Sequence, residues 1–582
     1  MNIPLKQYVH LLADYLKPQQ RRVIWLAITL LGSIALQLLN PQILGYFIDT
    51  AVAGGASQTL FIAALLFISV AIVTQILAVS ATYLGENVAW TATNALRVDL
   101  VEHCLNLDLS FHKSRTPGEL VERVDGDVNT LSRFFSQFTL HVLGNLILLF
   151  GILVVLFYKD WRACFCLSAF ALTALTVLVR FRAYAIPPWV RYRQISAEFF
   201  GFLGEHLVGT EDLRPNGAIS YVMRRFYQLL QRWLPVFHQA RLASTVLWTA
   251  SVGLFGVGNA MALTIGAYLW KQNAITIGTV YLIFYYTNLL SQPIERIREE
   301  LENLQQAEAS ILRIRELLQV QSKISLEGNQ PLPEGALSVA FDNVSFGYEG
   351  EWEREELALK DILFYLPSSQ VLGLLGRTGS GKSTLARLLL RLYDPQTGSI
   401  RLGDIALPQT PLADLPHRIG LVTQDVQLFQ TTVRNNLTFF DSQITDVQIL
   451  DALEVLGLST WLHSLPLGLD TLLGADSSGL SAGQAQLLAF ARVFLKNPGL
   501  VILDEASSRL DPETENQIEN AVNKLLEGRT GIIIAHRLKT VQRADQILIL
   551  EQGRIVEYGE RTTLVNDPDS RFAQLLRTGL TE

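Results

Sequence analysis

The feature that most constrains the fold is a series of long apolar stretches in the first half of the chain. Six such stretches occur: Val23–Phe47, Leu60–Leu84, Leu140–Phe157, Trp161–Val179, Leu247–Leu269 and Ile277–Leu290. A helix of roughly 20 residues crosses a hydrocarbon core about 30 Å thick, and most of the stretches have this length or can be extended to it. The pattern predicts six membrane-spanning helices. For the short sixth stretch a buried core helix is the alternative.

Basic residues predict the orientation of these helices. They gather ahead of the first stretch and in the long segments that follow the second and fourth stretches, and include Lys6, Lys17, Arg21, Arg22, Lys113, Arg115, Arg123, Arg182, Arg191, Arg193, Arg224 and Arg225. The alternate segments are short and hold only Lys159, Arg162 and Lys271. Because such an excess marks cytoplasmic segments, we expect both termini in the cytoplasm. The first stretch begins too late and is too long for a signal peptide, so we expect it to remain in the protein.

Composition excludes some other classes of function. The formal net charge is −7, and no block of Lys or Arg indicates nucleic-acid binding. The three cysteines, Cys104, Cys164 and Cys166, lack metal-ligand spacing and predict no disulfide framework. The long polar segments after the second and fourth stretches have helical periodicity and are too long for turns, so they predict extensions of the membrane helices into the cytoplasm.

A phosphate-binding motif lies in the second half of the chain. Residues Gly376–Ser383 read Gly-Arg-Thr-Gly-Ser-Gly-Lys-Ser, between a strand-like run, Val371–Leu375, and a helical run, Leu385–Leu392. Glycines allow backbone N–H groups to surround phosphate oxygens at a helix N-terminus, where Lys382 adds a positive charge and Ser383 offers a hydroxyl to Mg²⁺. The nucleotide-binding residues predicted here are Gly376, Arg377, Thr378, Gly379, Ser380, Gly381, Lys382, Ser383 and Thr384. A glycine-rich turn without a ligand is the alternative.

A pair of acidic residues follows a second apolar run. Leu500–Leu503 has the composition of a central parallel strand and leads directly into Asp504 and Glu505. Ligands of α/β folds bind at the carboxyl ends of such strands. Asp504 is placed to hold Mg²⁺ through water, and Glu505 to orient and polarise the water that attacks the γ-phosphate of ATP. Two solvated acids at a strand end are the alternative.

A third motif, Leu480-Ser481-Ala482-Gly483-Gln484, precedes a helical run, Ala485–Phe494. With the two preceding motifs it resembles the ATP-binding cassette (ABC) proteins, whose LSGGQ sequence differs here only at Ala482. Six apolar stretches followed by one cassette resemble a half-size exporter, and the resemblance covers nearly the whole chain. It implies a multidomain fold: an all-α polytopic membrane domain of six long helices, followed by an α/β P-loop NTPase domain. We expect a membrane domain at 1–320, a linker at 321–336 and a nucleotide-binding domain at 337–582.

The resemblance also implies roles for single residues. Tyr348 matches the aromatic residue that stacks on adenine, and Gln424 matches the glutamine that contacts Mg²⁺ and the attacking water. His536 matches the histidine that contacts the γ-phosphate. Ser481, Gly483 and Gln484 belong to the motif that binds the nucleotide held by the opposite cassette, and Asp511 to the loop that crosses to that partner. The implied catalytic set is Glu505, His536 and Gln424, and the implied metal set is Ser383, Gln424 and Asp504.

Two segments resemble the coupling segments of such exporters, Phe111–Asp127 and Gly209–Phe226. The implied function is ATP-driven export of an amphipathic small molecule, lipid or peptide by a two-chain, multi-pass transporter of the bacterial cytoplasmic (inner) membrane. Departures from the family pattern at Ala475 and Arg509, both on the side that faces the partner, favour a heterodimer over a homodimer. Aromatic and amide residues of the sixth stretch are candidates for a substrate cavity: Tyr281, Phe284, Tyr285, Tyr286 and Asn288. An importer on the same scaffold and a nucleotide-gated channel or regulatory subunit are the alternatives.

Overall fold

The computed structural model describes residues 14–325, 328–348, 357–424, 426–474, 480–504, 512–535 and 538–578. Its described residues form two compact units. The first unit contains the residues up to Leu105 together with Pro117–Val320, and the second contains Asn106–Thr116 together with the residues from Gln321 onward. The chain therefore leaves the first unit at Leu105, contributes a short segment to the second unit and returns at Pro117.

The first unit is all helical and has six long helices, which contain five of the six apolar stretches entirely and the third, Leu140–Phe157, from Gly144 onward. These helices are α2 (Gln20–Val52), α3 (Ser57–Leu105), α7 (Gly144–Lys159), α8 (Trp161–Val208), α10 (Ile219–Lys271) and α11 (Ile277–Gln319). The shorter elements are η1 (Lys17–Gln19), α5 (Pro117–Val121), η2 (Glu122–Asp127), α6 (Val128–Gln137), η3 (Phe138–Leu143) and α9 (Thr210–Leu213). The fold class predicted for this part of the chain is confirmed.

Five helical segments of the described chain are long and apolar enough to cross a membrane: Asp14–Val52, Ser57–Leu105, His141–Lys159, Trp161–Leu178 and Ile219–Lys271. Large apolar side chains on their outer faces are exposed, as expected of surfaces that contact lipid. The sixth predicted stretch lies in α11, which is apolar only in its first part. There α11 packs against α2, α7, α8 and α10. Its Leu282, Ile283 and Leu290 are buried in the core of the unit.

Local capping explains why the long helices turn back where they do. Asp160 separates α7 from α8, and its side chain accepts hydrogen bonds from the backbone N–H groups of Arg162 (2.7 Å) and Ala163 (3.4 Å). Thr276 caps α11 by accepting a hydrogen bond from the Thr279 N–H at 3.2 Å. Each cap satisfies donors that the first turn of a helix leaves without an intrahelical partner.

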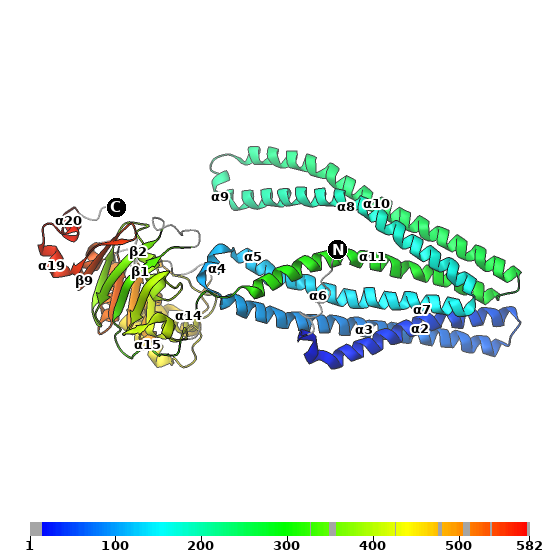
Figure 1. The fold of residues 1–582 in the computed structure, drawn as a ribbon, viewed down its shortest axis with the longest axis horizontal. Helices are drawn as coiled ribbons and strands as arrows, with labels where there is room; N and C mark the ends of the chain where they lie inside the picture. Colours follow the sequence, from blue (N-terminus) through cyan, green and yellow to red (C-terminus); the bar gives the residue numbers. More distant parts are fainter. Residues whose placement is uncertain are drawn as a thin grey trace. The chain divides into compact units, whose positions relative to one another are not determined.

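An aromatic ladder joins α8 to α10, which form a helical hairpin with α9 near its tip (Figure 1). The ladder contains Trp189, Tyr192, Phe199, Phe226, Trp233 and Phe237. The rings of Trp233 and Phe237 stack with their centroids 5.1 Å apart. The indole N–H groups of Trp189 and Trp233 donate to Ser244 (2.8 Å) and Ser196 (3.1 Å). Contacts between these half-buried aromatic rings therefore help to hold α8 and α10 together.

Two sheets form the centre of the second unit. A six-stranded sheet has the order β10-β9-β3-β8-β7-β6, and a four-stranded sheet has the order β2-β1-β4-β5. The strands are β1 (Val339–Phe346), β2 (Leu359–Leu366), β3 (Val371–Leu375), β4 (Thr397–Leu402), β5 (Ile405–Ala406), β6 (Ile419–Val422), β7 (Leu500–Asp504), β8 (Thr530–Ile534), β9 (Gln546–Glu551) and β10 (Arg554–Glu560). Strands β9, β3, β8, β7 and β6 are parallel and almost entirely buried, which agrees with their apolar sequences.

Helices surround these sheets. They are α12 (Lys382–Leu389), α13 (Leu415–Arg418), α14 (Val433–Thr438), α15 (Asp446–Val455), α16 (Ser459–Ser464), α17 (Ala482–Lys496), α18 (Pro512–Leu526), α19 (Arg561–Asn566) and α20 (Arg571–Thr578), with short turns η4 (Leu407–Gln409), η5 (Gly468–Asp470) and η6 (Leu538–Arg543). The second unit is therefore the α/β domain that the motifs predict.

The segment Asn106–Thr116 carries α4 (Leu109–Ser114) into the second unit. Asp108 caps α4 by accepting hydrogen bonds from the backbone N–H groups of Ser110 and Phe111, and its second oxygen accepts the N–H of Lys323 at 2.8 Å. Burial is the largest single influence on this carboxyl group and raises its pKa. The hydrogen bonds to Lys323, Phe111 and Ser110 together outweigh burial and hold the pKa of Asp108 below its usual value. A charged cap thus fixes α4 to the chain that enters the second unit from α11.

Candidate nucleotide-binding site

The predicted phosphate and metal residues lie along one edge of the six-stranded sheet. Strand β3 leads into the glycine-rich loop, β7 ends at Asp504, and β6 ends two residues before Gln424. Strand β8 lies between β3 and β7, and its Ile534 is paired with Leu374 on one side and Asp504 on the other. Since these strands are parallel, their carboxyl ends meet at the same edge, where ligands of α/β folds bind.

The backbone of the glycine-rich loop excludes larger residues. Gly376, Gly379 and Gly381 have φ angles of 150°, 82° and 105°, in the region that L side chains rarely adopt. A Cβ atom at Gly376 would also lie 2.3 Å from the carbonyl oxygen of Leu550, and one at Gly381 would lie 2.7 Å from that of Ala358. Both contacts are shorter than van der Waals contact allows. The glycines are therefore required by backbone conformation as well as by any ligand.

The loop presents donor groups that suit a polyphosphate. Lys382 is only 5% exposed, and its ammonium group donates to the carbonyl oxygens of Gly376 (2.6 Å) and Arg377 (3.1 Å). Within the described residues, the buried hydroxyl of Ser380 has no hydrogen-bond partner. The hydroxyl-bearing Ser383 is exposed at the first turn of α12. A buried cation, an unsatisfied hydroxyl and a helix N-terminus at one loop fit phosphate oxygens.

Tyr348 follows β1 and lies beside the same loop. Its hydroxyl is 3.0 Å from the hydroxyl of Thr384, the third residue of α12, and accepts a hydrogen bond of 2.9 Å from Arg387. The Tyr348 ring is perpendicular to those of Phe346 and Tyr393, with centroids 5.1 and 5.4 Å away. These contacts place an aromatic ring next to the helix that follows the phosphate loop.

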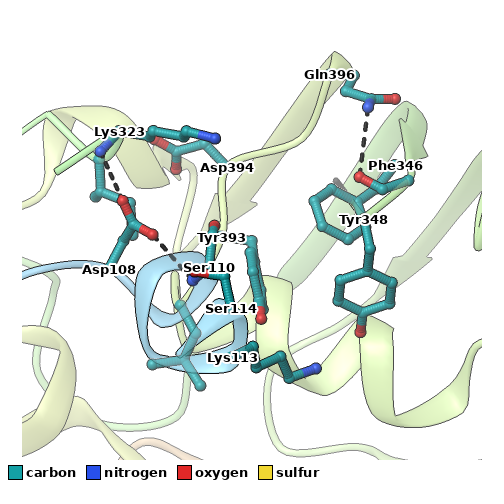
Figure 2. A pocket seen from close by; sticks show the side chains of 13 residues that line it. Asp108, Ser110, Lys113, Ser114, Lys323, Phe346, Tyr348, Tyr393, Asp394 and Gln396 are labelled. Carbon is teal, nitrogen blue, oxygen red and sulfur yellow. Dashed lines mark hydrogen bonds between the residues drawn. The ribbon is translucent and has the colours of Figure 1, made fainter. Parts of the chain in front are cut away.

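A pocket of about 660 Å³ opens beside Tyr348 (Figure 2). Residues of three segments line it: Asp108, Ser110, Lys113 and Ser114 of the α4 segment, Lys323 and Ile324, and Phe346, Gly347, Tyr348, Leu392, Tyr393, Asp394 and Gln396 of the nucleotide-binding fold. The ammonium group of Lys113 lies 4.5 Å from the centroid of the Tyr348 ring. The pocket combines aromatic walls with polar groups, as small-molecule sites do.

The third sequence motif forms the start of α17. Ser481 is its N-cap residue and accepts a hydrogen bond from the Gln484 N–H at 3.1 Å, while the Gln484 side chain accepts one from the Ser481 N–H at 3.0 Å. This capping box fixes the first turn of the helix. Ser481 is exposed there and Gly483 is buried. The motif therefore has a structural role within the chain, whatever it contacts in a partner.

Several predicted residues lie outside the described part of the structure: Glu505, His536 and Asp511, and also Ala475 and Arg509. Gln424 is described and exposed.

One residue that the motifs did not indicate is Arg492, on α17. It donates to the carbonyl oxygens of Asn436 (2.7 Å) and Gln427 (3.0 Å), and burial lowers its pKa to about 10. Arg492 thus connects the third motif's helix to the segment just after Gln424.

Comparison with known proteins covers both units. Residues 23–294 match the ABC transporter transmembrane region, and residues 359–508 match the ABC transporter family. An ATP-dependent lipid A-core flippase of Shewanella oneidensis is 31% identical over 81% of this chain and 78% of its own length. The probable multidrug resistance ABC transporter ATP-binding/permease protein YheH of Bacillus subtilis is also 31% identical, over 83% of this chain and 72% of its own.

The fold resembles that of a bacterial Atm1-family ABC exporter solved with ATP bound. The TM-score is 0.78 at 24% identity, and the alignment covers 96% of this chain and 98% of that one. Together with the helical unit, the phosphate loop and the sequence relatives, this fold leads to one conclusion. The chain belongs to the ATP-binding cassette transporter family as a half-size exporter, an integral membrane protein that binds ATP and couples its hydrolysis to transport.

Proposed function

We propose that the chain is one half of an ATP-driven exporter of amphipathic molecules in the bacterial cytoplasmic membrane, with both termini in the cytoplasm. The observation that carries this proposal is the alignment of the phosphate loop, Asp504 and Gln424 along one edge of the six-stranded sheet. The same chain supplies the helical unit through which a substrate would pass.

In this proposal one set of residues binds the adenine and the phosphates of ATP, and a second set holds Mg²⁺. Tyr348 stacks on adenine, and the segment from Gly376 to Thr384 binds the phosphates through its N–H groups and Lys382. Ser383, Gln424 and Asp504 hold Mg²⁺, which when bound neutralises charge on the β- and γ-phosphate oxygens. The exposed hydroxyl of Ser383 and the carboxylate of Asp504, on the same sheet edge, are oxygen donors of the kind that Mg²⁺ prefers.

The remaining residues complete the catalytic site. Glu505 orients and polarises the attacking water, and His536 contacts the γ-phosphate. Ser481, Gly483 and Gln484 approach the nucleotide of the opposite chain, and Asp511 lies in the loop that crosses to that chain. A half-size exporter works with a second chain because each nucleotide needs both cassettes. ATP binding, by favouring the closed pair, can then shift the transporter between its two states.

The substrate face proposed on α11 contains Tyr281, Tyr285 and Asn288, which are spaced at about one helical turn. Tyr285 and Asn288 are exposed, and Asn259 of α10 donates to Asn288 at 2.8 Å. Tyr286 does not belong to this face, which corrects the sequence prediction. Its side chain is fully buried, and its hydroxyl donates to the carbonyl oxygen of Leu38 at 2.7 Å, so it is part of the α2–α11 core.

The substrate class that these residues suit is amphipathic: a lipid, a small molecule or a peptide. Aromatic rings supply apolar contact, and hydroxyl and amide groups supply hydrogen bonds. The flippases among the relatives, which are named for lipid A-core, support a lipid.

We further propose that the second chain is a different protein. The argument is that Ala475 and Arg509 depart from the family sequence on the partner-facing side, while the residues of this chain's own hydrolytic set are retained. A homodimer is the competing assembly. Purification of this chain expressed alone tests the point: a stable two-copy assembly with full, substrate-stimulated ATPase activity would exclude an obligatory partner.

The central test compares wild type, Glu505→Gln and Lys382→Ala in inside-out vesicles. We expect Glu505→Gln to bind ATP but lose most hydrolysis and uptake, because the amide keeps the shape and loses the charge that polarises water. Lys382→Ala is expected to weaken nucleotide binding. Near-normal turnover in Glu505→Gln would refute its assignment. Flux in the opposite direction would establish an importer, and ATP-gated currents without coupled flux would establish a channel.

A further inference from the structure

The α4 segment contributes a wall to the pocket beside Tyr348. Lys113, near the end of α4, is exposed to solvent, yet its ammonium group lies over the Tyr348 ring at 4.5 Å from the centroid and 5.8 Å from that of Tyr393 (Figure 2). A cation within about 6 Å of an aromatic centroid is attracted by the negative face of the ring. Lys113 therefore makes a specific contact with the ring that we assign to adenine.

The positions of both partners are fixed by neighbouring contacts. Asp108 caps α4 and accepts the Lys323 N–H, and Leu109 packs against the buried core that contains β1. Tyr348 is held through its hydroxyl by Thr384 and Arg387 of α12. The contact thus connects a segment that lies between two membrane helices with the helix that follows the phosphate loop.

Lys113 and Tyr348 both line the pocket, so a base that enters it meets the ring and the ammonium group together. A base that stacks on the ring face covered by the ammonium group has to displace Lys113. The lysine is long and its end is exposed, so it can move into water, while Tyr348 is restrained at its hydroxyl. A nucleotide base and Lys113 cannot both occupy one ring face.

We propose that Lys113 is a positioning residue that competes with adenine for Tyr348, so that nucleotide binding and the docking of α4 oppose each other through this ring. The proposal rests on the proposed role of Tyr348 as the adenine-stacking residue. If Lys113 and adenine compete in this way, binding of the base, and not only of the phosphates, changes the contacts of the α4 segment. This gives the cassette a means of signalling adenine occupancy to a segment that is continuous with α3 and α5.

The test measures equilibrium binding of ATP and of tripolyphosphate, which has no base, to the full-length protein carrying Glu505→Gln so that ATP is not consumed. In this background Lys113→Met keeps the apolar stem and removes the charge. We expect ATP to bind about two- to fivefold more tightly, the size of an exposed cation–π contact, and tripolyphosphate affinity to be unchanged. Arg115→Met is the matched control, because it removes a positive charge whose guanidinium lies over Phe111 and not Tyr348.

The outcomes are distinct. The proposal is overturned if Lys113→Met leaves the ATP affinity unchanged or lowers it. A lysine that only attracts anions predicts the latter result, with weaker binding of both ATP and tripolyphosphate. The proposal is also overturned if Lys113→Met raises the affinity for tripolyphosphate as much as the affinity for ATP. The gain should disappear in the Tyr348→Ala background, and its persistence there would refute the contact. If Lys382→Ala leaves the affinity for both ligands unchanged, it is the nucleotide site itself that is misassigned.

Discussion

Replacing Asp127 by alanine should measurably destabilise the first unit. Asp127 is 2% exposed, at the end of η2, and receives hydrogen bonds from two residues of α11. The hydroxyl of Ser310 donates at 2.8 Å and the Nε of Arg313 donates at 2.8 Å, while an Nη of Arg313 also bonds to the carboxylate. These contacts raise the pKa of Arg313, chiefly through the hydrogen bond to Asp127. They join the start of α6 to the helix that leads out of the membrane unit.

The size of the effect follows from what each partner loses. Ser310 is buried, so loss of its acceptor costs about 1 kcal/mol. The side chain of Arg313 is 45% exposed, so water replaces most of its lost interaction and about 1 kcal/mol remains. The sum of about 2 kcal/mol is below the 3–5 kcal/mol of a fully buried ion pair broken on one side. It corresponds to a fall of about 3 °C in the unfolding midpoint of a unit of this size, since the entropy of unfolding grows with the number of residues.

The assay is thermal unfolding of the purified protein in one detergent at one scan rate, because irreversible unfolding makes the midpoint depend on rate. Asp125→Ala is the matched control. This carboxylate lies two residues away, pairs with Arg97 at 3.5 Å and has a side chain that is 65% exposed, so its loss should change stability by less than about 1 kcal/mol. Equal effects of the two substitutions would refute the reasoning, because burial would then not distinguish them.

Three further predictions concern the other parts of the chain. Asp108→Ala should destabilise the second unit by about 1–2 kcal/mol in the same assay, and Asp108→Asn should destabilise it by less, because asparagine also caps helices. Since folding lowers the pKa of Asp108, the stability that its carboxylate contributes should be present above the usual pKa of 3.8 and be lost as the pH falls through the folded-state pKa. The stabilities of wild type and Asp108→Asn should therefore converge in acid. Arg492→Met should reduce ATPase activity more than ATP affinity, because it frees the segment after Gln424 while leaving the phosphate loop intact; a parallel loss of both would contradict this. In a protein without its native cysteines, Ser57→Cys on intact cells should react with an impermeant thiol reagent and Ser114→Cys should not, and the reverse labelling would overturn the orientation.

Much of the fold was determined by local sequence. The apolar stretches specify long helices because hydrocarbon leaves a spanning segment no other way to satisfy its backbone. The run Val371–Leu375 is β3 at the predicted bounds, and Leu500–Leu503 falls within β7. The glycines of the phosphate loop were equally recognisable, because positive φ angles and close backbone contacts admit no other residue. Each of these features depends on a few consecutive residues, so pattern and spacing suffice to identify it.

Tertiary structure decided what lies between these features. Sequence presented Phe111–Asp127 as one coupling segment, whereas the fold divides it: α4 belongs to the second unit, and Pro117–Asp127 to the first. Tyr286 and Tyr285 are adjacent in sequence, yet one is buried against α2 and the other is exposed. The contacts of Asp127 with Arg313 and of Lys113 with Tyr348 join residues far apart in the chain. No local pattern encodes such pairs, because they exist only once packing has set which faces of distant helices and strands meet.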